Sequence, residues 1–153
     1  MPTTVDRDAT IAVLRRTWAA IDDLYDGLTE ADHDRPTCLP GWTVKDQLSH
    51  VTSTEETLLG LPTPQVDVSG VPHLRNDIAR MNEAWVEDKR SWSGAEVLAR
   101  FRAVTAERLA VLDAMDQAAF DAPSWTPAGP DETYGRFMRI RHFDSYHHEL
   151  DAR

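Results

Sequence analysis

Apolar residues recur three and four positions apart along most of the chain, which is the repeat of a helix with one buried face. A first helix is expected over about 6–28, where the repeat consists of Ile11, Leu14, Trp18, Ile21, Leu24 and Leu28. The same repeat predicts further helices over 43–60, 74–92, 94–115 and 132–153.

The ends of these helices are marked by capping residues and by segments rich in proline and glycine. Thr43 and Ser93 each precede an acidic residue by three positions, the spacing of a capping box. Proline and glycine interrupt the helical pattern over 29–41, 61–73 and 116–131, and no segment shows the sustained alternation of a strand. We therefore expect one all-α domain spanning the 153 residues, a bundle of four main helices with one additional short helix.

The last predicted helix has two neighbouring stripes of different character. One stripe is mainly apolar and is expected to be buried; it consists of Ile140, Phe143, His147 and Leu150. The other is mainly polar and consists of Phe137, Arg141, Asp144, His148 and Asp151. A polar stripe beside a buried one is where helical bundles build metal sites, so we expect it to face a cleft between helices.

Asp144 and His148 lie four residues apart, so their side chains share one face of the helix, one turn apart. A carboxylate and an imidazole at this spacing can share a metal ion, and His50 on the helix 43–60 can supply a third ligand. Two histidines and one carboxylate leave a coordination position open, as in catalytic metal sites. Zn²⁺ is the favoured ion for these ligands, and Ni²⁺ is the alternative.

Composition and charge narrow the class of protein. The formal net charge of −10 repels phosphate backbones and argues against nucleic-acid binding. No apolar run approaches the roughly 18 residues of a membrane span, and the N-terminus has no signal core, so a cytoplasmic location is expected. Of the 16 basic residues, 14 are Arg and two are Lys, which indicates a high-GC bacterial source. The sequence leaves open whether the protein is a homodimer.

Cys38 is the only cysteine, so an internal disulfide and a cysteine-rich zinc site are both excluded. Two interpretations stay open for it. Cys38 is either a reactive thiol or a small buried residue before a Pro-Gly turn, and the second is favoured.

Two separated motifs resemble the DinB-like helical proteins, in particular their mycothiol-dependent maleylpyruvate isomerase branch. The first is the segment 40–46, Pro-Gly-Trp-Thr-Val-Lys-Asp, followed by Leu48 and His50. The second consists of Arg141, Asp144, His148 and Asp151. Residues 125–127 and 135–138 also resemble actinobacterial members. The resemblance implies a four-helix bundle, a divalent metal, usually zinc, held by His50, Asp144 and His148, and a low-molecular-weight thiol as cosubstrate.

The sequence departs from the isomerase pattern in two places. Asp144 stands where the isomerase has Glu, so a metal would lie closer to the helix that carries it. The isomerase also continues into a further domain, whereas this sequence ends at Arg153. Either the sequence is part of a longer protein, or the activity that needs that domain is absent or different.

Several residues near the expected site have two interpretations. Arg141 either pairs with Asp144 or contacts an anionic substrate. Asp151 either orients the free ring nitrogen of His148 or forms a salt bridge at the helix end. Glu55 is a general base or, as we favour, a salt-bridged side chain.

Other aromatic and histidine side chains are expected to have structural roles. Trp42 is expected to pack so that it holds His50 in place, and His147 to lie buried or behind the ligands. The remaining histidines, His33, His73 and His142, are expected to be exposed or in loops.

Two classes of function are compatible with these features. In the first, a metal-bound thiol, which the family resemblance indicates to be mycothiol, attacks an electrophilic small molecule, giving isomerisation, S-transfer or conjugation. In the second, the bundle binds a metal or small molecule without catalysis, in a stress response or in regulation. For either function, the segments 36–41 and 116–131 are expected to rim the cleft that holds His50 and His148.

Overall fold

The computed structural model describes all 153 residues and is mainly helical. In chain order, the helices are α1 (Arg7–Asp26), α2 (Glu30–His33), α3 (Val44–Leu58), α4 (Asp77–Asp88), α5 (Gly94–Ala114), α6 (Gln117–Asp121) and α7 (Tyr134–Asp151). A two-stranded antiparallel hairpin, β1 (Pro123–Thr126) and β2 (Gly129–Thr133), lies between α6 and α7. The predicted all-α class is confirmed, with this hairpin as a small addition. None of the helices combines the length and apolar character that a membrane span needs.

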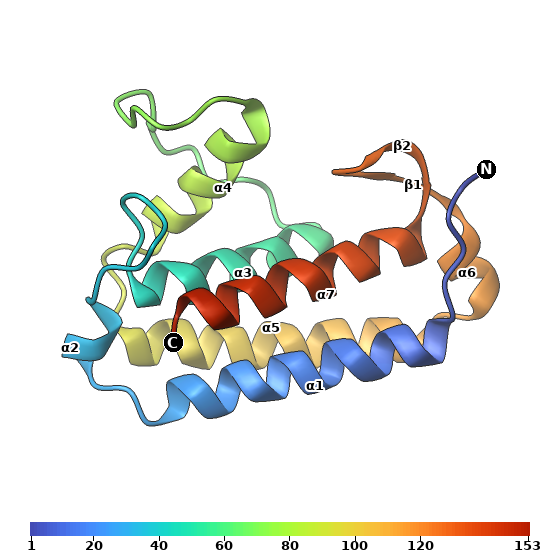
Figure 1. The fold of residues 1–153 in the computed structure, drawn as a ribbon, viewed down its shortest axis with the longest axis horizontal. Helices are drawn as coiled ribbons and strands as arrows, with labels where there is room; N and C mark the ends of the chain where they lie inside the picture. Colours follow the sequence, from blue (N-terminus) through green and yellow to red (C-terminus); the bar gives the residue numbers. More distant parts are fainter.

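The four long helices α1, α3, α5 and α7 form the bundle (Figure 1). Each packs against two others, in the cyclic order α1, α5, α3, α7. Figure 1 shows that α1 and α7 run in one direction and that α3 and α5 run in the other. The neighbours α3 and α7 are therefore antiparallel, and the first half of α3 lies beside the second half of α7.

The core is one continuous cluster of 14 buried residues between these helices. Each long helix contributes to it at the helical repeat, for example through Trp18, Leu48, Phe101 and Met138. Burial of such side chains stabilises a fold by roughly 1.5–3 kcal/mol each. The core includes residues of all four long helices and so packs α3 and α7 into the same bundle.

The start of α3 is fixed by the capping box that its sequence predicts. The Thr43 hydroxyl accepts a hydrogen bond from the backbone N–H of Asp46, and the Asp46 carboxylate accepts one from the backbone N–H of Thr43. Ser93 and Glu96 form the same reciprocal pair at the start of α5. Because α3 begins at a defined residue, His50 has a defined place on its second turn.

Three segments differ from the sequence-based expectation. The segment 29–41 is not only loop, because Thr29 caps the one-turn helix α2. The helix expected over 74–92 is shorter and spans Asp77–Asp88. The segment 116–131 contains α6 and most of the hairpin, whose strands have four and five residues with an irregular register between them. Strands this short show no alternation that a sequence pattern could reveal.

The buried face of α7 is not the one that its apolar stripe predicts. Phe143 is 63% exposed and Leu150 is 44% exposed, whereas Arg141, Ser145 and Glu149 are buried. The prediction that the apolar stripe is buried is therefore wrong. The face that carries Arg141 and Ser145 is buried because neighbouring helices offer it partners, such as the Trp18 indole N–H that donates to Ser145 Oγ at 3.4 Å.

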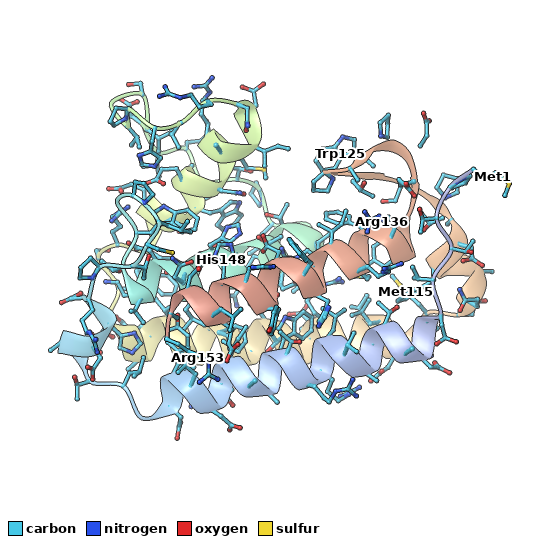
Figure 2. The ribbon with its side chains drawn as sticks, viewed as in Figure 1. Met1, Met115, Trp125, Arg136, His148 and Arg153 are labelled. Carbon is cyan, nitrogen blue, oxygen red and sulfur yellow. The ribbon has the colours of Figure 1, made fainter.

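Two smaller elements stand on the side of the bundle where α3 meets α7. Helix α4 packs on α3, and strand β1 packs on α7 (Figure 1). Figure 2 shows Trp125 on the hairpin and His148 on the second half of α7. Helix α4 and the hairpin therefore flank the contact between α3 and α7 on the outside of the four-helix bundle.

Candidate metal centre

His50 on α3 meets Asp144 and His148 on α7 at the seam between the two helices. His50 Nε2 lies 3.2 Å from Asp144 Oδ2, and His148 Nε2 lies 3.5 Å from Asp144 Oδ1. One ligand atom from each of the three residues lies within 4.8 Å of the other two. The prediction that these helices bring the two histidines together is confirmed. The three donors are close enough to share one ion with bonds of about 2 Å.

Burial and charge set the protonation of this cluster. Burial lowers the pKa of His50 below its ordinary value, and the neighbouring Asp144 only partly opposes this. Burial alone would raise the pKa of Asp144, but the charge of Arg141, together with contacts to both histidines, lowers it well below its ordinary range. His50 is therefore neutral and Asp144 ionised near pH 7, the states in which both ligate a cation.

Gln47, one turn before His50, fixes the orientation of His148. Its Oε1 lies 2.5 Å from His148 Nδ1, and its Nε2 donates to Thr37 Oγ1 at 2.8 Å. Because an amide oxygen only accepts, Nδ1 carries the proton, which leaves Nε2, on the side of Asp144, as the nitrogen whose lone pair can ligate a metal. A ring nitrogen and a carboxylate oxygen directed at each other can share a cation, so the donor set suits a divalent metal.

Neither of the two interpretations of Asp151 fits the structure. Asp151 forms no hydrogen bond with His148 and no salt bridge at the helix end; its Oδ1 accepts a hydrogen bond from Cys38 Sγ at 3.3 Å. The role of Gln47 could have been predicted from its position three residues before His50, which places both side chains on one face of α3.

We predict that Gln47→Leu weakens metal binding by about 10–100-fold, the usual effect of removing a hydrogen bond to a metal-ligating histidine. The affinity is measured by competition with a chromophoric chelator. Gln65→Leu is the control, because Gln65 is exposed in a loop and should leave the affinity unchanged. Equal affinities for Gln47→Leu and the wild type would show that Gln47 does not position His148.

Asp144 is the end of a chain of ion pairs that runs through Arg141 and Glu55 to Arg108. Arg141 Nη1 donates to Asp144 Oδ2 at 2.6 Å, and Arg141 Nε donates to Glu55 Oε1 at 2.8 Å. The other oxygen of Glu55 accepts from Arg108 Nε at 2.9 Å. The predicted pairing of Arg141 with Asp144 is confirmed. Glu55 is the salt-bridged side chain that we favoured, and with both oxygens engaged by guanidinium groups it is not a general base.

Aromatic packing completes the surroundings of the two histidine rings. The Trp42 ring lies 5.3 Å from the His50 ring and 5.9 Å from the His148 ring, measured between centroids. The Trp42 indole N–H donates to Glu83 Oε2 at 2.7 Å, which fixes the ring. The expected packing of Trp42 against His50 is confirmed, and it extends to His148.

Two histidines outside the cluster lie in environments opposite to those predicted. His147 is exposed and its ring packs on that of Phe143, so the expectation of a buried residue is wrong. His33 is buried beneath the start of α5, where a Cβ on Gly94 would lie 2.1 Å from its ring. Its burial follows from α2, the short helix that the sequence pattern did not reveal.

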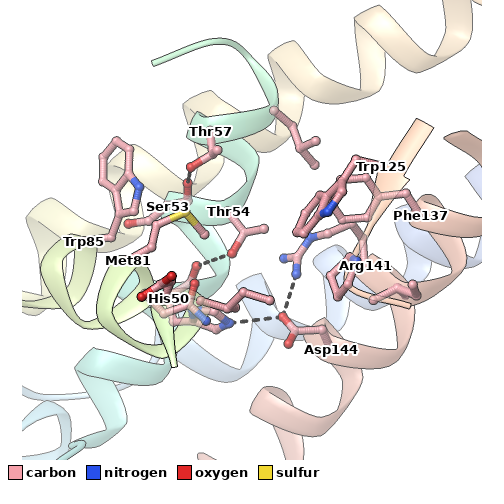
Figure 3. A pocket seen from close by; sticks show the side chains of 16 residues that line it. His50, Ser53, Thr54, Thr57, Met81, Trp85, Trp125, Phe137, Arg141 and Asp144 are labelled. Atoms are coloured by element: carbon pink, nitrogen blue, oxygen red, sulfur yellow. Dashed lines mark hydrogen bonds and ion pairs between the residues drawn. The ribbon is translucent and has the colours of Figure 1, made fainter. Parts of the chain in front are cut away.

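A cavity of about 470 Å³ opens beside the cluster, and Figure 3 shows the side chains that line it. Its lining comes from α3, α4, the hairpin and α7, and His50, Arg141 and Asp144 stand at its polar end. Of the two segments that were expected to rim this cavity, one does so. Trp125 and Pro127 of the segment 116–131 line the cavity, whereas the segment 36–41 does not and α4 takes its place.

Cys38 lies away from this cavity and is exposed, so the favoured interpretation of a small buried residue is wrong. A hydrogen bond to Asp151 raises the pKa of the Cys38 thiol. A raised pKa lowers the fraction of thiolate, so Cys38 is not an activated nucleophile either.

The sequence matches the family described as the mycothiol maleylpyruvate isomerase N-terminal domain over residues 14–153. The chain belongs to this family. No curated protein matches the chain by sequence. The resemblance inferred from the two motifs is therefore confirmed at the level of fold and family.

Solved structures with the same fold include the mycothiol-dependent maleylpyruvate isomerase, with a TM-score of 0.74 and 15% identity over 98% of this chain. The chain spans 63% of the length of that isomerase. YfiT from Bacillus subtilis, described as a probable metal-dependent hydrolase with an unusual four-helix bundle topology, has a TM-score of 0.70 and 19% identity, covering 99% of this chain and 89% of its own. The colibactin self-resistance protein ClbS, solved with double-stranded DNA, has a TM-score of 0.71 and 12% identity, covering 95% and 92%. At these identities the likenesses show the fold of this family member.

Proposed function

We propose that this member of the family is a divalent-metal-dependent enzyme that uses a low-molecular-weight thiol, mycothiol, to isomerise an electrophilic small molecule or to transfer sulfur to it. The observation that carries the proposal is the His50–Asp144–His148 cluster at the end of a cavity with mainly apolar walls. Three protein ligands leave a coordination position for an exogenous group. Zn²⁺ is the favoured ion, and Ni²⁺ suits the same ligands.

When bound, the cation supplies a positive charge that attracts a thiol and lowers its pKa. The residues of the chain have the supporting tasks. Arg141 keeps Asp144 ionised and fixed, and Gln47 keeps the Nε2 lone pair of His148 directed at the cluster. A substrate that fills the cavity, whose walls are mainly apolar, would displace water from the reacting groups, which strengthens electrostatic interactions there.

The thiol is expected to come from outside the chain. Cys38 is the only cysteine, it does not line the cavity, and its pKa is raised by the hydrogen bond to Asp151. We therefore predict that Cys38→Ser retains the wild-type rate, whereas omission of added thiol abolishes turnover.

The test measures turnover of two electrophiles by the metal-loaded protein, with mycothiol, with glutathione and with no thiol. 1-Chloro-2,4-dinitrobenzene reports S-transfer, and a cis-enedione reports isomerisation. His50→Ala should reduce the thiol-dependent rate by at least about 100-fold, because metal-assisted catalysis contributes several kcal/mol. His147→Ala, an exposed histidine on α7, is the matched control and should keep its rate.

Either of two results would contradict the proposal. Turnover that needs no thiol would remove the thiol from the mechanism. Stoichiometric metal binding without turnover of either electrophile would favour the alternative of a non-catalytic binding bundle.

A further inference from the structure

Arg90 joins two buried carboxylates where the end of α4 meets the start of α3. These carboxylates belong to Asp46 on α3 and Glu83 on α4. Arg90 Nη1 donates to Asp46 Oδ2 at 3.2 Å, and Arg90 Nη2 donates to Glu83 Oε1 at 3.1 Å. The same Nη2 also donates to the carbonyl oxygen of Gly41 at 3.1 Å. Arg90 therefore ties α4 to the turn that leads into α3.

Glu83 also reaches the surroundings of the metal centre. While Arg90 holds its Oε1, its Oε2 accepts the hydrogen bond of the Trp42 indole N–H at 2.7 Å. The Trp42 ring in turn packs on the rings of His50 from α3 and His148 from α7, with centroids 5.3 Å and 5.9 Å away. One ring thus contacts a proposed ligand from each of two helices, and a carboxylate on a third helix fixes that ring.

A purely structural role explains the buried carboxylate of Glu83 poorly. A buried ion pair is weak evidence for stability, because desolvation of its charges can cost more than their attraction returns. An apolar side chain at position 83 would pack α4 onto α3 without that cost. It would offer no acceptor, however, and the indole N–H of Trp42 only donates. What a carboxylate adds at this place is therefore control over the orientation of the Trp42 ring.

We infer that Glu83 is a positioning residue of the metal centre, which acts through Trp42 to hold the rings of His50 and His148 in the orientation that a bound cation requires. Because Glu83 lies on α4, the same contact couples this wall of the cavity to the metal centre. A metal that fixes the histidine rings favours the docked position of α4, and the docked helix favours metal binding by the same factor. The inference rests on the proposed function for the divalent cation alone, and it involves neither thiol nor substrate.

The first test is a double-mutant cycle on the affinity for Co²⁺, measured by competition with a chromophoric chelator. Trp42→Phe keeps an aromatic ring but removes the N–H, and Glu83→Leu removes the acceptor. Each should weaken Co²⁺ binding by about 10-fold, the lower end of the usual effect of mutating a residue that supports metal ligands. The double variant should bind no more weakly than the weaker single variant, because both changes break the same hydrogen bond.

Further variants separate this role from a structural one. Glu87→Gln is the matched control, because Glu87 is an exposed carboxylate that pairs with Arg90 and forms no hydrogen bond with Trp42. It should leave the affinity unchanged. Where Glu83→Leu does not fold, Glu83→Gln replaces it in the cycle, because an amide offers one oxygen to two donors. The visible absorption of bound Co²⁺, which reports the geometry of its ligands, should change in Trp42→Phe and in the Glu83 variant but not in Glu87→Gln.

Hydrogen exchange tests the coupling to α4. At saturating Co²⁺, the backbone amides of α4 should exchange several-fold more slowly than in metal-free wild type, and this protection should be absent from Trp42→Phe. The short helix α6, at the other end of the molecule (Figure 1), is the internal reference and should exchange alike with and without Co²⁺ in both proteins.

Additive losses of affinity in the double variant would show that Glu83 acts on the fold and not through Trp42. Wild-type affinity and absorption in Trp42→Phe would show that the histidine rings do not depend on this hydrogen bond. Either result would overturn the inference and leave the proposed function standing. Protection of α4 that is as large in Trp42→Phe as in wild type would overturn the coupling to α4. Failure of the wild type to take up Co²⁺ would overturn both the inference and the proposed function.

Discussion

Replacing His148 by alanine is expected to lower metal affinity by more than 100-fold while the helical bundle stays folded. The loss should exceed the roughly 10–100-fold effect of removing a supporting hydrogen bond, because a ligand atom itself is lost. The fold should persist because the 14-residue core between the long helices does not include the cluster. Metal content is measured by elemental analysis after exhaustive dialysis, and folding by far-UV circular dichroism.

The neighbouring His147 provides a stringent control for this variant. His147→Ala removes an exposed imidazole from the same helix, so it should leave metal content at the wild-type level. Equal metal content in His148→Ala and wild type would remove His148 from the ligand set. Loss of helical signal in His148→Ala would mean that the cluster is needed for folding, contrary to the packing of the core.

Replacing Glu55 by glutamine is expected to lower the free energy of unfolding by about 3–5 kcal/mol, the cost of leaving buried charges without their partner. Glu55 has no exposed surface and separates two buried guanidinium groups, those of Arg108 and Arg141. A neutral amide would leave the two positive charges unbalanced in the interior. Urea-induced unfolding, followed by circular dichroism, measures the change.

An exposed ion pair serves as the comparison for Glu55. Arg15 and Asp113 form a pair in which both side chains are 52% exposed. Asp113→Asn should cost no more than about 1 kcal/mol, because water screens such pairs. A similar, small loss for Glu55→Gln would show that the buried charge chain does not stabilise the fold. Its role would then be confined to holding Asp144.

The helical bundle and the His50–Asp144–His148 cluster could be predicted from the sequence for different reasons. The bundle follows from apolar residues such as Leu14, Trp18 and Leu48, whose spacing directly reports a buried helical face. The cluster follows from Asp144 and His148, whose separation of four residues forces them onto one side of a helix. His50 required the family resemblance, since no local pattern says which helix packs beside α7.

The walls of the cavity were harder to predict from the sequence. Helix α4 replaces the segment 36–41 as a wall of the cavity because it packs on α3, a contact between elements that have no common sequence pattern. The hairpin was missed because its strands are too short to alternate visibly.

By itself, the sequence determined the helices, their capped starts at Thr43 and Ser93, and the shared face of Asp144 and His148, because all of these depend on spacing along one chain segment. The tertiary structure decided which face of α7 is buried. Sequence hydrophobicity favours burial of Phe143 and Leu150, but the buried carboxylate of Glu55 selects Arg141 instead. A buried charge must be paired, and its partner comes from another helix, so only the packed bundle specifies it.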